Sequence, residues 1–416
     1  MSGVVIVVGG GIVGASCAYE LALRGWRVTL LDASRVGGGC SQGNCGYVCP
    51  SHVYPLARPG TIAATLPLVF RRNSPFAVRA RLDLPLFAWF DAFRRCCTEA
   101  QVEATMGALH DLLAAGKARY EEVIRAEGID AEYEQQGCLF ISKDEAHLDH
   151  FEADNRRMTE RFGYGARRID GKSLAAMEPT LRDGLGGAWM FDCDAHLRPD
   201  RYMAGLRAVL LRRGVRVCEG TRVVAIEGEH GRATGVLTES GRMESDAIVV
   251  ATGAWTPELA RCIGARLPIV PGKGYSVTLS GGQQLARRPM VFEQHRVAVT
   301  PFRGAVRIGS TMEFAGYDAT IRDERLRLLT ESASLYFKEP VRATREGAWF
   351  GWRPMVPDGK PFIDRAPRFR NVMVAAGHSM IGMSTGPGTG QVVAQLLSGE
   401  APAFDPAPFR IGRRMG

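Results

Sequence analysis

The strongest pattern of apolar and polar positions lies at the start of the chain. Val4–Val8 is an unbroken β-branched run, which is typical of a strand buried on both faces of a parallel sheet. Glycines follow at once, and then comes a helical stretch with small and apolar residues on one side, which Gly25 ends. A second apolar strand over residues 27–31 leads to Asp32. We therefore predict a β–α–β unit at the beginning of an α/β protein.

The glycines of this unit follow the spacing G-x-G-x-x-G, at Gly9, Gly11 and Gly14. Gly9 permits the tight turn, Gly11 lets the backbone approach a pyrophosphate, and Gly14 allows helix and strand to pack closely. The start of the helix offers free N–H groups and a positive dipole end to the phosphates. Asp32 can accept hydrogen bonds from a pair of ribose hydroxyls. Together these parts indicate a dinucleotide site, but they do not say which dinucleotide binds.

A second glycine-rich loop, residues 36–46, follows the second strand directly. A nicotinamide enzyme has no need of such a loop at this point, whereas a buried flavin must be wrapped along its ribityl chain and ring. The loop contains Ser41, Asn44 and Gly46. With the preceding unit, it resembles the D-amino-acid oxidase and dehydrogenase superfamily of FAD enzymes.

Later segments resemble the same superfamily in the same order. Residues 251–255 (ATGAW) are similar to its second FAD-contacting motif, and residues 351–361 look like its G-x-R-P-x-x-x-D-G-x-P signature. A buried strand over 372–376 then runs into a glycine-rich turn and a final helix. The resemblance extends from residue 4 to about residue 399 and is closest to bacterial D-amino acid dehydrogenases.

This resemblance implies both a fold and a cofactor. The fold would be α/β (α+β overall), with an FAD-binding, Rossmann-like doubly wound domain and a substrate domain built on a mixed sheet. FAD would be bound non-covalently, and the N-terminus of the final helix would stabilise negative charge on the reduced flavin. The residues expected to contact FAD are Gly9, Gly11, Ile12, Val13, Gly14, Asp32, Ala33, Ser34, Ser41, Asn44, Gly46, Val223, Val224, Thr252, Gly253, Trp255, Gly351, Gly377, His378, Met380, Ile381, Gly382 and Met383.

The flavin motifs are interrupted along the chain, so the FAD-binding domain is expected to be discontinuous. It would comprise residues 1–50, 184–265 and 351–400. The substrate domain would comprise residues 51–183 and 266–350, followed by a loose, Pro-rich tail over 401–416. Within the substrate domain, the pattern predicts one charged helix over 144–162 and strands over 136–142, 297–300 and 306–309.

Oxidising an α-amino acid requires an anchor for its carboxylate and a Cα–H that faces the flavin N5. Arg353, in its Gly-x-Arg-Pro setting, is the natural anchor because a guanidinium binds a carboxylate through two hydrogen bonds. Tyr275 either helps to bind the carboxylate or belongs to the core. His295 and His52 either line the substrate pocket or are held by backbone hydrogen bonds. Hydride transfer from Cα to N5 needs no protein acid or base, so catalysis would rest on orientation and proximity.

The expected function is FAD-dependent oxidation of a small D-amino acid to the imino acid, with electrons passing to a membrane quinone or another acceptor. D-proline or a hydroxy-D-proline is a specific candidate, suggested by the histidines and by the breadth of the superfamily. The enzymatic alternative is a glycine- or sarcosine-type amine oxidase that releases hydrogen peroxide. Two hypotheses from different classes are an RNA-binding flavoprotein and a flavin-binding subunit that is inactive outside a larger complex.

Composition narrows these hypotheses. The chain has 416 residues, of which 46% are apolar and 23% charged, as in globular proteins. Its formal net charge is +8, and Lys occurs only six times among the 52 basic residues. This Arg-rich background lacks aromatic–basic interleaving across several segments, so nucleic acid is not an expected partner.

One basic stretch stands out from the background. Residues 61–97 combine leucines and aromatic residues with the arginines of segment 71–95. The apolar residues from Leu86 to Phe93 recur at helical spacing, which predicts an amphipathic helix. This helix either lies on an anionic membrane surface as a peripheral anchor or packs on the substrate domain.

Membrane-spanning, secreted and metal-binding classes of protein are not expected. The chain contains no apolar run of about 18 residues, so we expect no transmembrane helix. It begins without a basic n-region or a secretory cleavage site, so we expect it in the cytoplasm or at the inner face of the cell membrane. Its ten cysteines are too sparse for a disulfide scaffold, and neither they nor the histidines are spaced as metal ligands, so no metal is expected.

Overall fold

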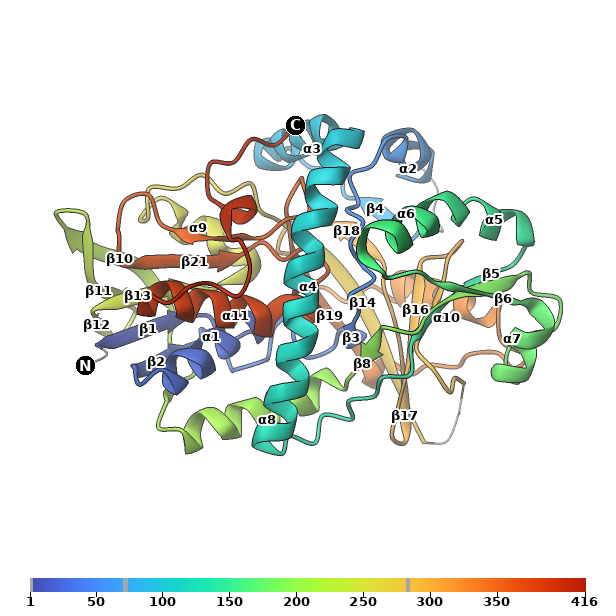
Figure 1. Cartoon of the computed structure of the whole chain (residues 1–416), viewed down its shortest axis with the longest axis horizontal. Helices are drawn as coiled ribbons and strands as arrows, with labels where there is room; N and C mark the ends of the chain where they lie inside the picture. Colours follow the sequence, from blue (N-terminus) through green and yellow to red (C-terminus); the bar gives the residue numbers. More distant parts are fainter. Residues whose placement is uncertain (1–2, 70–73, 282–284) are drawn as a thin grey trace.

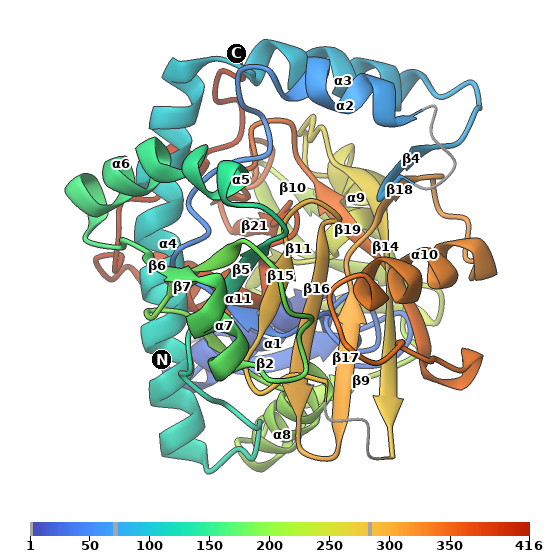
Figure 2. The same ribbon diagram turned by 90° about the vertical axis from the view of Figure 1, so that its right-hand side faces the viewer.

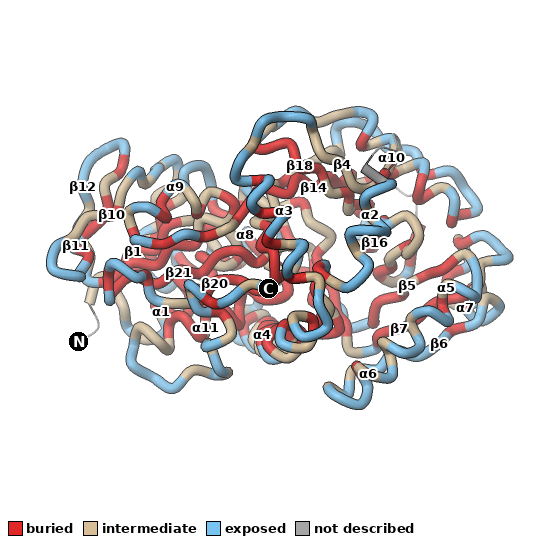
Figure 3. Tube along the Cα trace, turned by 90° about the horizontal axis from the view of Figure 1, so that it is seen from above, coloured by how far each residue is buried: buried red, intermediate tan, exposed pale blue. Residues whose placement is uncertain are grey.

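The computed structural model describes residues 3–69, 74–281 and 285–416. Two sheets organise the chain, a six-stranded sheet in one half and a ten-stranded sheet in the other (Figure 1). The long helix α4 (Glu99–Glu127) crosses the front of the molecule between them. Buried segments fill the centre of each half, and exposed loops lie at the periphery (Figure 3).

The six-stranded sheet has the order β20-β21-β13-β1-β2-β9. Strand β1 lies inside it, paired in parallel with β2 and β13, and both of its faces are covered. This position explains the continuous apolar run of Val4–Val8. Strand β20 runs antiparallel to β21. The strands are β1 (Val4–Val8), β2 (Arg27–Leu31), β9 (Arg216–Cys218), β13 (Ala247–Val250), β20 (Phe362–Arg365) and β21 (Val372–Ala376).

Helices α1 (Ile12–Leu23), α11 (Gly382–Ser398) and α4 share one hydrophobic core with one face of this sheet. A Cβ at Gly390 would lie 2.6 Å from the backbone of Ser16 in α1, and one at Gly388 would lie 2.8 Å from the amide nitrogen of Gly116 in α4. Helix α11 is therefore rich in glycine because two other helices approach its backbone. The opposite face is covered by a small antiparallel sheet of β10 (Val223–Glu229), β11 (Arg232–Thr238) and β12 (Gly241–Glu244).

The ten-stranded sheet is mixed, with the order β4-β18-β14-β17-β16-β15-β5-β7-β6, and β19 pairs with β14. Helices α2 and α3 lie above β4 and β18 along one edge of the molecule (Figure 2). The strands are β4 (Phe76–Val78), β5 (Cys138–Ser142), β6 (Arg167–Asp170), β7 (Gly187–Phe191), β14 (Val270–Ser280), β15 (Met290–Phe292), β16 (Val297–Phe302), β17 (Ala305–Gly309), β18 (Met312–Phe314) and β19 (Ala348–Met355). The remaining elements are β3 (Tyr47–Val48), β8 (Ala195–His196), α2 (Thr61–Val69), α3 (Leu84–Cys96), α5 (Glu145–Asp149), α6 (Glu152–Phe162), α7 (Gly171–Met177), α8 (Pro199–Arg212), α9 (Thr256–Ala260), α10 (Asp323–Ser334) and three single-turn helices, η1 (Gly253–Trp255), η2 (Arg345–Gly347) and η3 (Ala407–Phe409).

The six-stranded sheet takes its strands from three separate parts of the chain, residues 4–31, 216–250 and 362–376. Strand β7, expected in the FAD-binding part, belongs to the ten-stranded sheet, as does all of β19. Helix α4, expected in the substrate part, packs on α1 and α11 instead. The apolar face of a helix or strand indicates that it is buried, but not which of two cores buries it.

The single helix predicted over 144–162 is wrong. The chain forms α5 and α6, with a break at residues 150–151. Asp144 caps α5 by accepting a hydrogen bond from the amide of His147. The indole N–H of Trp189 donates to the carbonyl of Leu148 at 3.1 Å, which takes up an acceptor of the helical ladder at the break.

Helix α3 coincides with the amphipathic stretch predicted from the sequence. Asp83 caps it, and its aromatic side packs inward, with Trp89 buried and its indole N–H donating to the carbonyl of Met355 at 2.9 Å. The aromatic face is therefore part of the protein interior, as the packing hypothesis predicted. Leu82 and Leu84 at the start of α3 are 90% and 73% exposed. Arg71 and Arg72 lie outside the described residues.

The C-terminal segment is packed, not loose as expected. Phe409 is fully buried in the core beside α4. The guanidinium of Arg413 binds both oxygens of buried Asp358, at 2.8 and 3.0 Å, and Gly416 ends against Arg95 of α3. The apolar and charged residues of the tail thus hold it across the fold.

We expect Arg413→Ala to lower the free energy of unfolding by about 3 kcal/mol, because it strands the buried carboxylate of Asp358. The value lies at the low end for a broken buried pair, since Lys360 Nζ remains 3.9 Å from Asp358. Urea unfolding measures the change. The exposed neighbour Arg414, changed to Ala, is the control and should shift stability by less than about 0.5 kcal/mol. Equal effects of the two variants would contradict this role of Arg413.

Candidate functional site

A cavity of about 1470 Å³ lies between the two halves of the molecule. Its wall includes the ends of β1, β2 and β13, the turn after β21, and residues of β14 and β19. Most ligand pockets measure about 300–1,000 Å³, so this one is large enough for more than a single small molecule.

The cofactor half of the cavity is built around two helix N-termini. Helix α1 begins after Gly11 and α11 after Ile381, and in neither case does the side chain of the N-cap residue cap the helix. Neither first turn contains an acidic residue. Two positive dipole ends therefore face the same cavity, which suits the pyrophosphate and the pyrimidine edge of FAD.

Asp32 is oriented at the end of β2 by backbone amides. One carboxylate oxygen accepts a hydrogen bond from Gly10 N at 2.7 Å, and the other accepts from Ser34 N at 2.8 Å. Asp32 lines the cavity, and carboxylate lone pairs remain for hydroxyl donors. This geometry is compatible with the ribose hydroxyls for which the sequence predicts Asp32 as acceptor.

The second glycine-rich loop is fastened to the ten-stranded sheet through its carbonyl groups. Ser276 Oγ donates to the carbonyl of Gly43 at 2.6 Å, and Thr300 Oγ1 donates to that of Cys45 at 2.7 Å. At the other end of the loop, Ser41 Oγ accepts from the amide of Ile12 at 2.9 Å. The loop therefore bridges the start of α1 and the second sheet.

Arg307 is a further clamp on this loop, and sequence reasoning missed it. Its guanidinium is buried and donates to the carbonyls of Asn44 at 2.9 Å and Gln42 at 3.3 Å. Asp200 lies 3.3 Å away, and Thr278 accepts from Nε. Burial lowers the pKa of the Arg307 guanidinium. No motif distinguishes this residue from the many exposed arginines.

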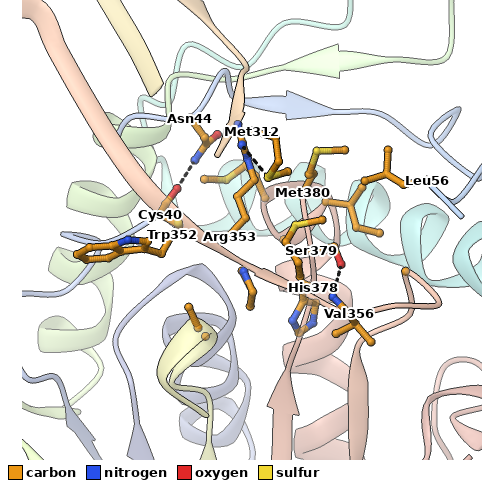
Figure 4. Close-up of a pocket in the computed structure, with 18 of the residues that line it drawn as sticks. Cys40, Asn44, Leu56, Met312, Trp352, Arg353, Val356, His378, Ser379 and Met380 are labelled. Atoms are coloured by element: carbon orange, nitrogen blue, oxygen red, sulfur yellow. Dashed lines mark hydrogen bonds between the residues drawn. The ribbon is translucent and has the colours of Figure 1, made fainter. Parts of the chain in front are cut away.

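Arg353 projects from β19 into the pocket, with its guanidinium directed toward Met312 (Figure 4). Its Nη1 donates to the carbonyl of Thr311 at 2.7 Å. Gly274 of the neighbouring strand leaves space, because a Cβ there would collide with the guanidinium. Burial lowers the pKa of Arg353 from its ordinary value.

Arg353 differs from the other arginines of the described cavity wall in its ion pairing. Those four are paired with carboxylates of this chain: Arg58 with Asp154, Arg94 with Asp91, Arg222 with Glu258 and Arg296 with Glu293. Among the described residues, no carboxylate lies within ion-pair distance of Arg353. A desolvated cation without a counter-ion is suited to bind an anionic ligand.

The turn before α11 closes the pocket beside Arg353. His378 is buried, its Nε2 lies 3.0 Å from Thr389 Oγ1, and burial lowers its pKa to about 3, so the imidazole is neutral at pH 7. Ser379 has a φ of 48° and donates its N–H to the carbonyl of Pro354 at 3.1 Å. The turn is thus tied to the strand that carries Arg353.

The histidines and the tyrosine predicted in the substrate pocket separate into two groups. His52 lines the cavity against Tyr47 and Phe140, and burial lowers its pKa. His295 does not line the cavity and lies 2.9 Å from the hydroxyl of Tyr336. The expectation that His295 reaches the pocket is therefore wrong.

Tyr275 does not direct its hydroxyl toward Arg353. The hydroxyl donates to buried Glu313 at 2.6 Å, and the ring belongs to the core beneath α10. Side chains alternate along β14, so Tyr275 and Gly274, which lies against Arg353, face opposite sides of the sheet. Tyr275 also lines the cavity, but the bond of its hydroxyl to Glu313 favours the interpretation of Tyr275 as a core residue.

Most of the residues expected to contact FAD line the cavity, and four do not: Gly14, Val224, Gly351 and Gly377. The three glycines are needed for packing, because a Cβ would collide with Gly9 at position 14, would lie 2.9 Å from Cys40 Sγ at position 351, and 2.6 Å from Val356 at position 377. Val224 points outward, whereas its neighbour Val223 lines the cavity.

Comparisons with known proteins agree with this geometry. The sequence matches the family of FAD dependent oxidoreductases (DAO) over residues 5–396. The chain belongs to this family. D-amino acid dehydrogenase of Methylobacterium nodulans is 33% identical over 409 residues, which are 96% of each chain. The same-named protein of Cereibacter sphaeroides is 31% identical over 415 residues, 98% of this chain and 95% of the relative.

Solved structures of the same fold include glycine oxidase from Geobacillus kaustophilus, with a TM-score of 0.77 at 24% identity over 100% of both chains. L-proline dehydrogenase from P. horikoshii has a TM-score of 0.72 at 21% identity and covers 96% of this chain and 94% of its own. The predicted superfamily, fold class and FAD cofactor are thus confirmed. The protein is an FAD-dependent oxidoreductase.

The described residues contain neither a metal-binding cluster nor a membrane span. No group of three or more His, Cys, Asp or Glu side chains among them is arranged to hold a metal ion. No helix in the described part of the chain is long and apolar enough to cross a membrane.

We expect Arg307→Met to raise the Kd for FAD about 10- to 100-fold, because two loop carbonyls and Asp200 lose a buried, charged donor. Fluorescence titration of the apoprotein with FAD measures this. Arg327→Met, at an exposed position on α10, is the matched control and should leave the Kd unchanged. An unaltered Kd in Arg307→Met would show that the loop does not depend on this clamp.

Proposed function

We propose that the protein oxidises the Cα–N bond of a D-amino acid to the imino acid. The observation that carries this proposal is the half-buried guanidinium of Arg353, which pairs with no carboxylate among the described residues and lies in the cavity that also contains the cofactor-binding turns. The names of the relatives at 31–33% identity, D-amino acid dehydrogenase, support the substrate class. Bound FAD would supply the hydride acceptor for the Cα–H.

The residues of this chain would bind and orient the substrate. Arg353 would hold the carboxylate with the nitrogen atoms that the Thr311 carbonyl does not occupy. That carbonyl and the space above Gly274 fix the direction of the guanidinium. Neutral His378 adds no positive charge beside it, so the single cation defines where the carboxylate binds.

Two finer expectations have different support. A proline-type ring substrate is suggested by two histidines, and of these only His52 lines the cavity. Transfer of electrons to a membrane quinone is supported by the word dehydrogenase in the relatives' names and by the exposed leucines next to α3. Peroxide release, as in a glycine- or sarcosine-type oxidase, is the alternative outcome of the tests.

Anaerobic mixing of the holoenzyme with single D- and L-amino acids tests the proposal, because substrate oxidation bleaches the flavin. We expect bleaching by D-isomers. Arg353→Met should lower kcat/KM about 10²- to 10⁴-fold through loss of the charge-assisted carboxylate bonds, with the yellow cofactor retained. Arg353→Lys should recover part of this loss, because lysine keeps the positive charge but lacks the two parallel N–H donors of the guanidinium.

Arg345→Met, an exposed position just before β19, is the control and should bleach like the wild type. Bleaching by L-isomers alone, or wild-type rates in Arg353→Met, would refute the proposal.

We also propose that the surface formed by Leu82 and Leu84 contacts an anionic membrane and gives the enzyme access to quinone. Exposed apolar residues at one end of a helix that also carries Arg94 and Arg95 are typical of an interfacial helix, although Asp91 pairs with both arginines. The double variant Leu82→Asp/Leu84→Asp should lower turnover at least about tenfold with quinone in anionic vesicles, and leave turnover with a water-soluble dye unchanged.

Leu211→Asp, at an exposed leucine on α8, is the control for an added charge elsewhere. Rapid peroxide formation in air without an acceptor would exclude the quinone dehydrogenase and favour the oxidase. Equal quinone turnover in wild type and double variant would exclude the membrane surface.

A further inference from the structure

A group of aromatic rings stands next to the substrate anchor, and Met312 connects the two. Met312 Sδ lies 3.8 Å from Nη1 of Arg353. Met312 and Phe314 are two residues apart on β18, so they project from the same face of the strand. Glu313 projects from the opposite face, where it binds the hydroxyl of Tyr275.

Phe314 belongs to what we call the aromatic wall, which comprises Phe76, Trp89, Phe90, Phe93 and Phe314, and all five line the cavity. Trp89 is central, with ring centroids of Phe93, Phe314 and Phe90 at 5.3, 5.4 and 5.5 Å. Phe76 contacts Phe314 at 5.7 Å. These are ordinary distances for aromatic pairs that stabilise one another.

The position of the wall relative to Arg353 is fixed by the same strand. The indole N–H of Trp89 donates to the carbonyl of Met355, two residues beyond Arg353 on β19. Gly272 of β14 faces Arg353 in the register, and a Cβ there would lie 2.6 Å from both Met312 and Met355. Strands β14 and β19 therefore fix the position of the aromatic wall relative to Arg353.

Apart from the anchor Arg353, the charged groups beside the wall are paired among the described residues. Arg94 on α3 is paired with Asp91 at 3.0 Å, and Arg58 is paired with Asp154 at 2.5 Å and stacked on Tyr54. The carboxylates of Glu258 and Glu293 are likewise paired with arginines. Recognition of a charged side chain would require one of these pairs to break, whereas an apolar side chain requires only contact with the rings.

From this juxtaposition we infer that the aromatic wall is the side-chain subsite, and that the preferred substrates are amino acids with large apolar side chains, aromatic or branched aliphatic. This inference rests on the proposed function and replaces the small substrate expected from the sequence. Once Arg353 holds the carboxylate, a phenyl or isobutyl group can cover the rings and exclude water from the reacting carbon. A methyl group is too small to cover the rings, so water stays in contact with them.

The test measures anaerobic flavin bleaching of the holoenzyme with D-phenylalanine, D-leucine, D-alanine, D-glutamate and D-lysine. We expect kcat/KM for the first two to exceed that for D-alanine about 100-fold, with the charged substrates slower still. Phe90→Ala should lower kcat/KM for D-phenylalanine at least about tenfold and change that for D-alanine less than about threefold.

Phe87→Ala is the matched control, because Phe87 lies on the same helix, is exposed and does not line the cavity. Phe87→Ala should leave kcat/KM unchanged for both D-phenylalanine and D-alanine. Faster bleaching by D-alanine than by D-phenylalanine would overturn the inference while leaving the proposed function intact. An equal loss for both substrates in Phe90→Ala would also overturn it, since that is the result of general damage to the fold. Phe90→Leu, which keeps apolar volume, should restore most of the preference.

A binding measurement separates the inference from the proposed function. The unreactive carboxylates 3-phenylpropanoate and propanoate match phenylalanine and alanine without the amine, and their binding perturbs the flavin spectrum. We expect the wild type to bind 3-phenylpropanoate at least about tenfold more tightly than propanoate. In Phe90→Ala we expect this difference to be lost. If no amino acid bleaches the flavin and this difference persists, the subsite stands and the proposed reaction fails. Equal binding of the two carboxylates would exclude the subsite.

Discussion

The partial burial of Arg353 without a carboxylate partner among the described residues is the constraint on which the substrate half of the molecule depends. Removing a cation from water costs several kcal/mol unless hydrogen bonds and an opposite charge replace its hydration. The Thr311 carbonyl supplies one hydrogen bond, and an anionic ligand would supply the charge. The surrounding sheet is shaped around this group, since Gly274 and Gly272 of β14 leave space for Arg353 and for the methionines beside it.

The cofactor half faces a different requirement, because its loop must lie against a sheet to which it does not belong. Carbonyl groups of residues 42–45 are bound by Ser276, Thr300 and Arg307, all from the ten-stranded sheet. Strand β19 adds a second link, since Ser379 of the turn before α11 binds the carbonyl of Pro354. Cofactor and substrate sites are therefore held in register by polar contacts between the halves, and the chain crosses repeatedly from one half to the other.

A few of the many arginines have a structural role inside the molecule. Many arginines form ion pairs on the surface, where each pair contributes little, but Arg413 and Arg307 are buried and hold the tail and the flavin loop. The net charge of +8 therefore does not show where individual arginines lie, because a few of them are removed from solvent. The stretch around α3 illustrates the same point, since Asp91 and Asp83 neutralise arginines that the sequence presents as a basic cluster.

The sequence by itself determined the features that depend on local chemistry. A continuous apolar strand, a fixed glycine spacing and an acid at the next strand end suffice for the dinucleotide site, because one β–α–β unit supplies all of them. The Gly-x-Arg-Pro setting pointed to Arg353 in the same way, and the structure places this residue in the cavity wall. Only the tertiary structure decided that α4 covers the cofactor helices, that the hydroxyl of Tyr275 binds Glu313, that His295 lies outside the cavity, and that Arg307 binds carbonyls of the second glycine-rich loop. These outcomes depend on which face of a strand meets which core, and on partners far away in the sequence. Apolar periodicity shows that a side chain is buried, but the packing of the two sheets decides what it is buried against.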